Sequence, residues 1–361
     1  MTSMFVGPRV ADAERIAVLR ANALGDFVVA LPALEALRAA YPSAWITLLG
    51  RPLHEALLER RPSPVDEVVV LPDAAIGDEV AKSPGLDREA LIAALAGRHF
   101  DVAIQLHGGG RMSNAFLCRL GARVTVGSRT PDAPELDRWV PYELYQWEVA
   151  RYLEVVALVG ATPVVVEPRL TVIAADRVAL AAELPELEGS GYVVLHPGAS
   201  DPRRRWPVER FADVGRALRS RGRRLVVTGV PAEAALVDAL VDGLDGDALR
   251  ADRLSLPGLL ALVAGADLVV SNDTGPLHLA VATEAPTVGL FWVGNLINAG
   301  PFSRRRHRPL VSWRVACPVC GLDSTEERCP HDDSFVADIP TSAVIAAADS
   351  LLDSAAEPWI H

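Results

Sequence analysis

The sequence predicts an α/β protein built from two Rossmann-like, doubly wound domains with parallel sheets. Short apolar runs typical of buried strands alternate with helical segments along most of the chain. The alternation is interrupted by an extended, proline-bearing stretch at 161–174 and then starts again. A chain of 361 residues is long enough for two domains with separate cores. In such folds ligands bind at the carboxyl ends of the strands, so we expect a site there, between the domains.

The first domain is assigned to residues 1–165. Its predicted strands are 15–20, 45–49, 67–71, 101–106 and 124–127. Helices are predicted at 27–40, 53–60, 88–96, 112–120 and 143–159. The stretches 72–87 and 130–142, which are rich in proline and acidic residues, are expected to be irregular.

The second domain is assigned to residues 166–341. Its predicted strands are 192–195, 224–228, 268–271 and 287–291. Helices are predicted at 208–221, 232–240, 259–264 and 277–283. Residues 342–361 are assigned to a C-terminal amphipathic helix and tail, which we expect to cross back toward the first domain.

Composition and charge exclude several classes of protein. Acidic residues outnumber basic ones by 46 to 35, and the net charge of −11 argues against nucleic-acid binding. No apolar run is long enough to span a bilayer, and the N-terminus lacks the pattern of a signal peptide. We expect a cytoplasmic monomer with at most peripheral membrane contact. Because Lys82 is the single lysine, any phosphate clamp must be built from arginine.

Residues 271–280 (SNDTGPLHLA) join a predicted strand to a predicted helix. The free amides and the dipole at a helix N-terminus favour a phosphate, and Gly275 lets the backbone approach a ligand. Asp273, Thr274 and His278 are candidate ligand-binding residues. The alternative is an ordinary turn in which Asp273 or Thr274 caps the helix.

A second loop, after the strand at 192–195, has the composition of a diphosphate site. It carries three consecutive arginines at 203–205, and Gly198 and Ser200 offer backbone and hydroxyl donors. Arg204 and Arg205 are our candidates for gripping phosphate oxygens, and the alternative is a solvated charged loop. Glu233, at the start of the next helix but one, is a candidate for ribose hydroxyls or, alternatively, an ordinary first-turn acid.

Candidate catalytic chemistry lies in the first domain. Asp26 follows a glycine after the first strand, and a carboxylate there could deprotonate an attacking hydroxyl. The alternative is an N-cap for a helix beginning at Phe27. His107, before three glycines, is the rival base or a substrate-binding side chain. Asn22, Arg111 and Arg129 complete the candidate acceptor-binding set.

The four cysteines fall into two groups. Cys118 stands alone in an apolar segment and is expected to be a packed thiol. Cys317, Cys320, Cys329 and His331 could together bind structural zinc. The Cys-x-His spacing is not a standard zinc pattern, so we expect reduced thiols in a loop and keep zinc as the alternative.

Together these motifs resemble glycosyltransferase family 9, the ADP-heptose:lipopolysaccharide heptosyltransferases. The resemblance runs in order along nearly the whole chain, and each motif is weak alone. The matching stretches are Arg20-x3-Leu24-Gly25-Asp26, Leu31-Pro32-Ala33-Leu34, His196-Pro-Gly198-Ala, Arg204-Arg205-Trp206-Pro207, Gly229-x3-Glu233, Asp273-Thr274-Gly275-Pro276-x-His278-x-Ala280, Cys317-Pro-x-Cys320 and Cys329-Pro. The tail lacks a fourth family cysteine near Phe335.

The resemblance implies a GT-B fold, with the two domains facing each other across a cleft, and an inverting transfer of heptose from ADP-heptose to an acceptor hydroxyl without a catalytic metal or cofactor. The first domain would bind the acceptor and the second the nucleotide sugar. Asp26 would be the base, and Glu233 would hold the ribose. Arg204 stands where the family usually has a lysine on the donor phosphates. Asp273, Thr274, Gly275 and His278 would surround the diphosphate and sugar.

The sequence is also compatible with other functions. The acceptor could be the lipopolysaccharide inner core or a soluble metabolite such as an aminocyclitol or a nucleoside antibiotic. A nucleotide-sugar epimerase or a non-catalytic nucleotide-sugar binder could share the fold. A dinucleotide oxidoreductase is disfavoured, because no G-x-G-x-x-G follows the first strand.

Overall fold

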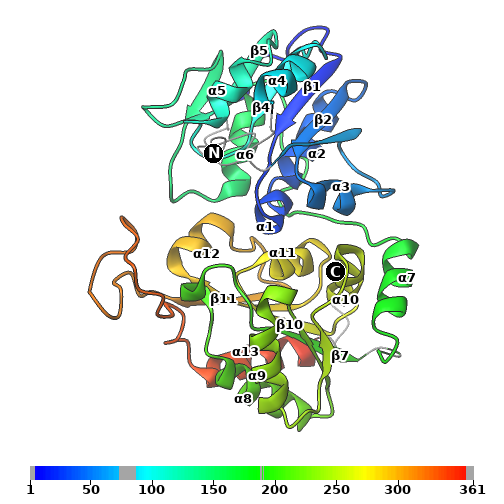
Figure 1. Cartoon of the computed structure of the whole chain (residues 1–361), viewed down its shortest axis with the longest axis vertical. Coiled ribbons are helices and arrows are strands. Elements are labelled where there is room, and N and C mark those ends of the chain that lie inside the picture. The colour runs from blue at the N-terminus through cyan, green and yellow to red at the C-terminus, as the bar shows by residue number, and fades with distance from the viewer. Residues whose placement is uncertain (1–4, 73–86, 188, 190, 355–361) are drawn as a thin grey trace. The chain divides into compact units, whose positions relative to one another are not determined.

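The computed structural model describes residues 5–72, 87–187, 189 and 191–354, which form two compact units (Figure 1). The first unit comprises 1–168 and the second 169–361, a division close to the predicted boundary after residue 165. Most of the acidic loop predicted at 72–87 lies outside the described residues. Within the described part of the chain, no helix has the length and apolar character needed to cross a bilayer.

The first unit contains a parallel sheet of six strands in the order β3-β2-β1-β4-β5-β6. The strands are β1 (Arg15–Leu19), β2 (Trp45–Gly50), β3 (Glu67–Val70), β4 (Val102–Gln105), β5 (Val124–Arg129) and β6 (Arg138–Pro141). The central strands carry apolar side chains that are buried on both faces of the sheet, which is typical of a parallel sheet. Strand β6 lies in the stretch predicted to be irregular, and it pairs with β5 along Val126–Arg129.

Helices connect these strands. They are α1 (Leu24–Val28), α2 (Leu31–Ala40), α3 (Pro52–Leu58), α4 (Arg88–Ala96), α5 (Ser113–Cys118) and α6 (Glu148–Ala157). The single helix predicted at 27–40 is two helices. Pro32 lies in the first turn of α2, where its missing N–H costs no helical hydrogen bond.

The second unit repeats the architecture. Its strands are β7 (Tyr192–His196), β8 (Arg224–Thr228), β9 (Leu249–Ala251), β10 (Leu268–Asn272), β11 (Thr287–Trp292) and β12 (His307–Ser312). Its helices are α7 (Ala174–Glu183), α8 (Val208–Arg219), α9 (Ala234–Gly243), α10 (Leu256–Ala264), α11 (Gly275–Ala282), α12 (Val293–Ala299) and α13 (Thr341–Ser354), with 3-10 turns at Pro202–Arg204 and Pro231–Glu233. The parallel sheet has the order β12-β11-β10-β7-β8-β9.

Both sheets therefore have the same doubly wound order. Numbered within its own unit, each sheet runs 3-2-1-4-5-6, the order of the Rossmann fold. In this order the chain reverses its direction of winding between the first and fourth strands, so a crevice opens at their carboxyl ends. The switch points are β1/β4 in the first unit and β7/β10 in the second.

The core of the second unit contains the C-terminal helix. Val344, Ala348 and Leu351 of α13 are buried in the same apolar cluster as Trp206 and Phe211. Helix α13 packs on α8, β10, β11 and β12, which all belong to this unit. The expected crossing toward the first domain stays a prediction, and residues 355–361 lie outside the described part of the chain.

Candidate active site

The switch point of the first unit contains three of the predicted site residues. The loop after β1 carries Asn22 and Asp26, and the loop after β4 carries His107. They line one cavity of about 280 Å³. Its wall is formed by Ala21, Asn22, Ala23, Asp26, Arg51, Leu71, Pro72 and His107.

Asp26 is positioned by the first turn of α1. The helix begins at Leu24 rather than Phe27, so Asp26 is its third residue and Ala23 is the N-cap. Asp26 Oδ2 accepts a hydrogen bond from the Ala23 backbone N–H at 3.3 Å. The alternative that Asp26 is the N-cap is therefore wrong, although its carboxylate does accept from the N-cap backbone. The side chain remains 43% exposed. The carboxylate is both fixed by the helix start and accessible to a ligand.

A buried arginine supports this loop from beneath. The Arg20 side chain is 2% exposed, and its Nε and Nη2 donate to the Asp26 backbone carbonyl at 2.9 and 2.6 Å. Arg20 Nη1 donates to the Leu106 carbonyl at 2.7 Å, which ties the end of β4 to the same loop. Glu148, 3.5 Å from Arg20 Nη2, supplies a counter-charge from α6. Arg20 therefore orients the Asp26 loop without using the Asp26 carboxylate as its main partner.

His107 has the wrong protonation pattern for a general base. Its Nδ1 accepts a hydrogen bond from the Ala21 backbone N–H at 3.2 Å, so the ring proton lies on Nε2. Burial and the nearby Arg20 charge lower the pKa of His107 to about 4. A neutral ring whose lone-pair nitrogen is occupied has no free basic site at neutral pH. It can donate a hydrogen bond from Nε2 to a ligand oxygen.

The two arginines predicted to bind the acceptor do not line this cavity in the described part of the chain. Arg111 is 75% exposed and lies 3.9 Å from Asp132. Arg129 donates to the Ala133 carbonyl at 3.1 Å and packs over the Trp139 ring. Their role in acceptor binding stays a prediction.

The switch point of the second unit brings together the two loops predicted to bind phosphate. Arg204 Nη1 lies 3.2 Å from Asp273 Oδ2, and Arg204 Nη2 donates to Ser200 Oγ at 2.9 Å. The Arg204 side chain is 25% exposed, so the contacts hold it in place without burying its charge. A preoriented cationic fork is the geometry suited to bidentate binding of phosphate.

Asp273 is the buried centre of this cluster, with a side chain 4% exposed. His278 Nε2 lies 3.1 Å from Asp273 Oδ1, and Asn295 Nδ2 donates to Oδ2 at 2.8 Å. Burial alone would raise the pKa of Asp273, but its contacts with His278, Arg204 and Asn295 outweigh burial and lower the pKa. Asp273 is therefore an anion that orients three other side chains.

Thr274 occupies the N-cap position of α11 but does not act as a cap. Its side chain makes no capping hydrogen bond, and Oγ1 is buried without a hydrogen-bond partner. A buried hydroxyl without a partner costs free energy unless a ligand supplies one. Together with the N-terminus of α11, it favours a site for an anionic oxygen over a simple turn.

Gly198 and Glu233 lie against each other. A Cβ atom at position 198 would come within 2.2 Å of the Glu233 carboxylate, so only glycine fits there without movement. Glu233 Oε2 accepts from the Val230 backbone N–H at 3.1 Å and closes the first turn after β8. The predicted ribose-binding acid is thereby placed beside the loop that was predicted to bind phosphate, and it also caps its own turn.

The other two arginines of the run have structural partners. Arg203 Nη2 pairs with Asp201 at 2.7 Å, and Arg205 Nε donates to the Ala199 carbonyl at 2.8 Å. Burial alone would raise the pKa of Asp201, but hydrogen bonds and charge from Arg203 lower it to about 2. Of the run, Arg204 is the one directed to Asp273, while donor binding by Arg205 stays a prediction.

Several positioning residues were missed by the sequence analysis. Asn272 accepts from the Trp206 backbone N–H at 3.0 Å and donates to the Pro197 carbonyl at 2.8 Å, which joins β10 to the loop after β7. Asn295, Arg51 and Glu148 were also missed. Asn295 follows β11, so the strand-end rule that identified Asp273 could have found it. Glu148 lies on a helix, and no local signal marked it.

Among the described residues, the group of side chains that could hold a metal ion is formed by Cys317, Cys320, Cys329 and His331. The two switch-point clusters do not form such a group in the described part of the chain.

The family model described as glycosyltransferase family 9 (heptosyltransferase) matches residues 88–314, well over half of the chain. This range includes β7, β10 and the loops after them.

Curated relatives match at low identity. Lipopolysaccharide heptosyltransferase 3 of Escherichia coli is 29% identical over 170 residues, which cover 46% of this chain and 48% of the relative. This chain thus spans about half the length of that relative. A putative glycosyltransferase of Haemophilus influenzae is 25% identical over 338 residues, 86% of this chain and 91% of the relative.

Solved structures match across both units. A glycosyltransferase family 9 protein from Veillonella parvula has a TM-score of 0.75 at 22% identity, covering 94% of this chain and 97% of its own. E. coli ADP-heptose lps heptosyltransferase II has a TM-score of 0.75 at 20% identity, covering 95% and 100%. These matches confirm the predicted two-domain α/β fold of the GT-B class.

Proposed function

Because this chain belongs to glycosyltransferase family 9 and is a glycosyltransferase, we propose that it transfers a heptose from ADP-heptose to an acceptor hydroxyl, with inversion and without a catalytic metal. The observation that carries the proposal is the division of chemistry between two equivalent switch points. One presents an accessible carboxylate, and the other an oriented cation beside a hydroxyl without a partner.

The second unit binds the nucleotide diphosphate in this proposal. Arg204 binds the phosphate oxygens, while Thr274 Oγ1 and the backbone N–H groups at the N-terminus of α11 donate hydrogen bonds to the same phosphate group. Glu233 accepts from the ribose hydroxyls beside Gly198. Arg204 replaces the lysine usual in the family, and its planar fork suits two phosphate oxygens at once.

The first unit binds the acceptor and supplies the base. The acceptor oxygen attacks the anomeric carbon while the bond from that carbon to the phosphate oxygen breaks, and its electron pair leaves with ADP. Asp26 takes the proton from the acceptor hydroxyl. Arg204 and the helix N-terminus stabilise the negative charge that develops on ADP. His107 donates from Nε2 to the acceptor or sugar and does not accept the proton.

The lipopolysaccharide inner core is the proposed acceptor. The support is the set of relatives described above, among them lipopolysaccharide heptosyltransferase 3 of Escherichia coli. Arg51 in the wall of the Asp26 cavity adds a cation suited to an anionic sugar acid.

The test is an Asp26→Asn variant assayed for ADP release with ADP-heptose and a lipid A acceptor bearing acidic sugars. We expect kcat to fall about 10²–10⁴-fold, because the variant lacks a proton acceptor, while ADP affinity is unchanged. Asp12→Asn is the matched control, since Asp12 is exposed, lies outside the cavity and has a positive φ of 53° that asparagine tolerates.

Two results would contradict the proposal. Full activity of Asp26→Asn would remove the base assignment. Transfer to a soluble aminocyclitol but not to the lipid A acceptor would replace the acceptor assignment.

A further inference from the structure

We propose that Cys317, Cys320, Cys329 and His331 form a structural zinc site that holds the donor loop at 201–205 in place. The metal site stands on its own geometry, whereas its effect on the donor loop rests on the proposed function. Sequence reasoning disfavoured this site because the spacing was irregular. The folded chain brings the four side chains together from positions up to 14 residues apart.

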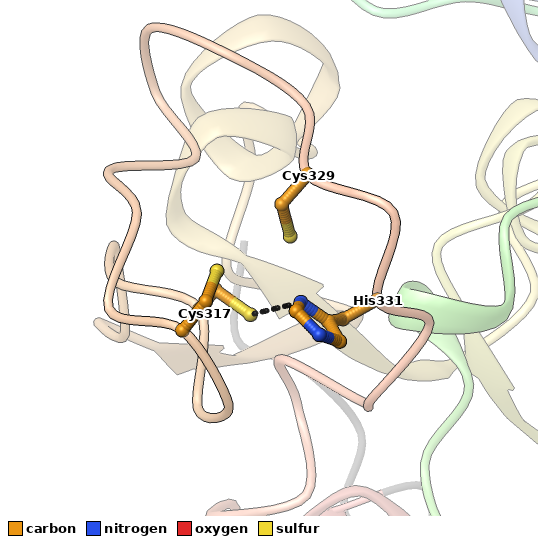
Figure 2. Close-up of side chains that lie close together, drawn as sticks. Cys317, Cys329 and His331 are labelled. Atoms are coloured by element: carbon orange, nitrogen blue, oxygen red, sulfur yellow. Dashed lines mark hydrogen bonds between the residues drawn. The ribbon is translucent and has the colours of Figure 1, made fainter.

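The four donor atoms lie close enough together to bind one metal ion. All of them lie within 4.8 Å of one another, and Cys317 Sγ is 3.8 Å from His331 Nδ1. With zinc bonds of about 2.3 Å to sulfur and 2.0–2.1 Å to nitrogen, neighbouring donors in a tetrahedron stand about 3.6–3.8 Å apart. Figure 2 shows Cys317, Cys329 and His331 directed toward one another.

The backbone around the first two cysteines is a tight turn. The Gly321 N–H donates to the Cys317 carbonyl at 2.9 Å, and the Cys317 N–H donates to the Leu322 carbonyl at 2.8 Å. Gly321 has a φ of +75°, a left-handed conformation that glycine adopts without strain. Ala316 and Asp323 form an antiparallel bridge that closes this turn. The turn fixes the chain between the two sulfurs of the Cys-x-x-Cys pair.

The donor set favours zinc. Three thiolates and one imidazole are a common ligand set of structural zinc sites, and four protein donors leave no open position for a substrate. The segment around the cluster has almost no regular structure of its own, since residues 313–340 contain neither a helix nor a strand. A metal would supply the stability that a small apolar core cannot.

The residues that follow the cluster pack on the donor loop. The Phe335 N–H donates to the Arg203 carbonyl at 2.7 Å, and the Arg203 guanidinium lies over the Phe335 ring at 5.2 Å. Arg328, next to Cys329, lies 3.3 Å from Asp201. A metal ion that fixes Cys329 and His331 therefore also restrains Asp201 and Arg203, which belong to the loop that carries Arg204. The zinc site is thus a positioning device for donor binding and does not touch the reacting atoms.

The first experiment measures metal content and stability of the full-length protein. We expect one zinc per chain by mass spectrometry, and replacement by cobalt should give the visible absorption of a tetrahedral thiolate site. A His331→Ala variant should lose the metal and unfold about 5 °C or more lower. A His331→Cys variant should keep the metal, because it restores four donors. Cys118→Ser is the matched control and should change neither quantity, since Cys118 lies outside the cluster.

The second experiment measures ADP affinity by calorimetry with and without the metal. We expect His331→Ala to bind ADP about tenfold more weakly, and His331→Cys to bind as the wild type does. Absence of metal, iron in place of zinc, or a Cys317–Cys320 disulfide in the purified protein would overturn the site. Unchanged ADP affinity after loss of zinc would overturn the positioning role. If the zinc-loaded wild type binds no ADP at all, the proposed function fails while the metal site stands.

Discussion

At the scale of single residues, the environment of each titratable group separates the candidate base from its rival. Asp26 keeps an accessible carboxylate, whereas the Nδ1 lone pair of His107 is taken by the Ala21 N–H. Sequence alone could not make this distinction, because both residues follow central strands and both are chemically suitable. The difference depends on a backbone contact that no sequence pattern encodes.

The first prediction at this scale concerns His107. Its pKa is lowered in the folded protein to about 4, below the value of about 6.5 in an unfolded chain. The neutral ring therefore stabilises the fold fully above pH 6.5, and this contribution is lost as the pH falls toward 4. We expect the NMR titration of His107 to show no midpoint near 6.5. The free energy of unfolding of the wild type should fall as the pH decreases from 6.5 to 4. In His107→Gln this decrease should be smaller by on the order of 2 kcal/mol.

Two results together would contradict this account: an NMR midpoint of His107 near pH 6.5, and a change in the wild-type reaction rate at the same pH. His107 would then again be a candidate for the general base. Gln105→Ala would not serve as a control, since Gln105 contacts the same loop.

The second residue-scale prediction concerns Arg204. Arg204→Gln removes the charge beside Asp273, and we expect ADP binding to weaken about ten- to hundredfold, as for loss of a charged hydrogen bond. Arg204→Lys should retain part of the affinity, because it keeps the charge but not the fork. Isothermal calorimetry with ADP measures both. Arg216→Gln, on the surface of α8 and paired with Asp213, is the matched control. Equal affinity in Arg204→Gln and Arg216→Gln would contradict a phosphate role for Arg204.

At the scale of elements, the central strands were predictable and the edges were not. The apolar runs of β1, β4, β7 and β10 are buried on both faces, so their composition predicts them. Strands β6, β9 and β12 are short or mixed in composition and form by pairing with a neighbour. Helices α7 and α12 were likewise missed. Local sequence contains little information about elements that tertiary contacts stabilise.

An element-scale prediction concerns the link between β10 and the loop after β7. Asn272→Leu would leave the buried Trp206 N–H and Pro197 carbonyl without their partner. We expect a loss of roughly 2–4 kcal/mol in the free energy of unfolding, measured by denaturant titration. Gln146→Leu should cost far less, because its bond to Glu154 is only partly buried. Equal small losses in both variants would show that the Asn272 bridge is not needed for the fold.

At the scale of the whole molecule, one topology used twice explains where the site residues lie. Each unit places polar side chains after its first and fourth strands, so the strand-end rule predicted Asn22, Asp26, His107, the arginine run at 203–205 and Asp273 from sequence. It could not predict which of three consecutive arginines faces Asp273, because that depends on the 3-10 turn at Pro202–Arg204. Nor could it predict the cysteine cluster, whose spacing is set by an irregular segment.

The same topology predicts that the two units respond separately to the nucleotide. ADP should stabilise the second unit by its own binding free energy. The first unit should gain nothing from ADP unless an acceptor is also present.

Hydrogen exchange of the full chain with and without ADP tests most directly whether ADP binds to the second unit alone. We predict slower exchange at 198–205, 228–233 and 273–278 on binding ADP, and unchanged exchange at 20–28 and 105–111. Protection of the Asp26 and His107 loops without protection of the Arg204 and Asp273 loops would contradict the central claim that the second switch point binds the nucleotide.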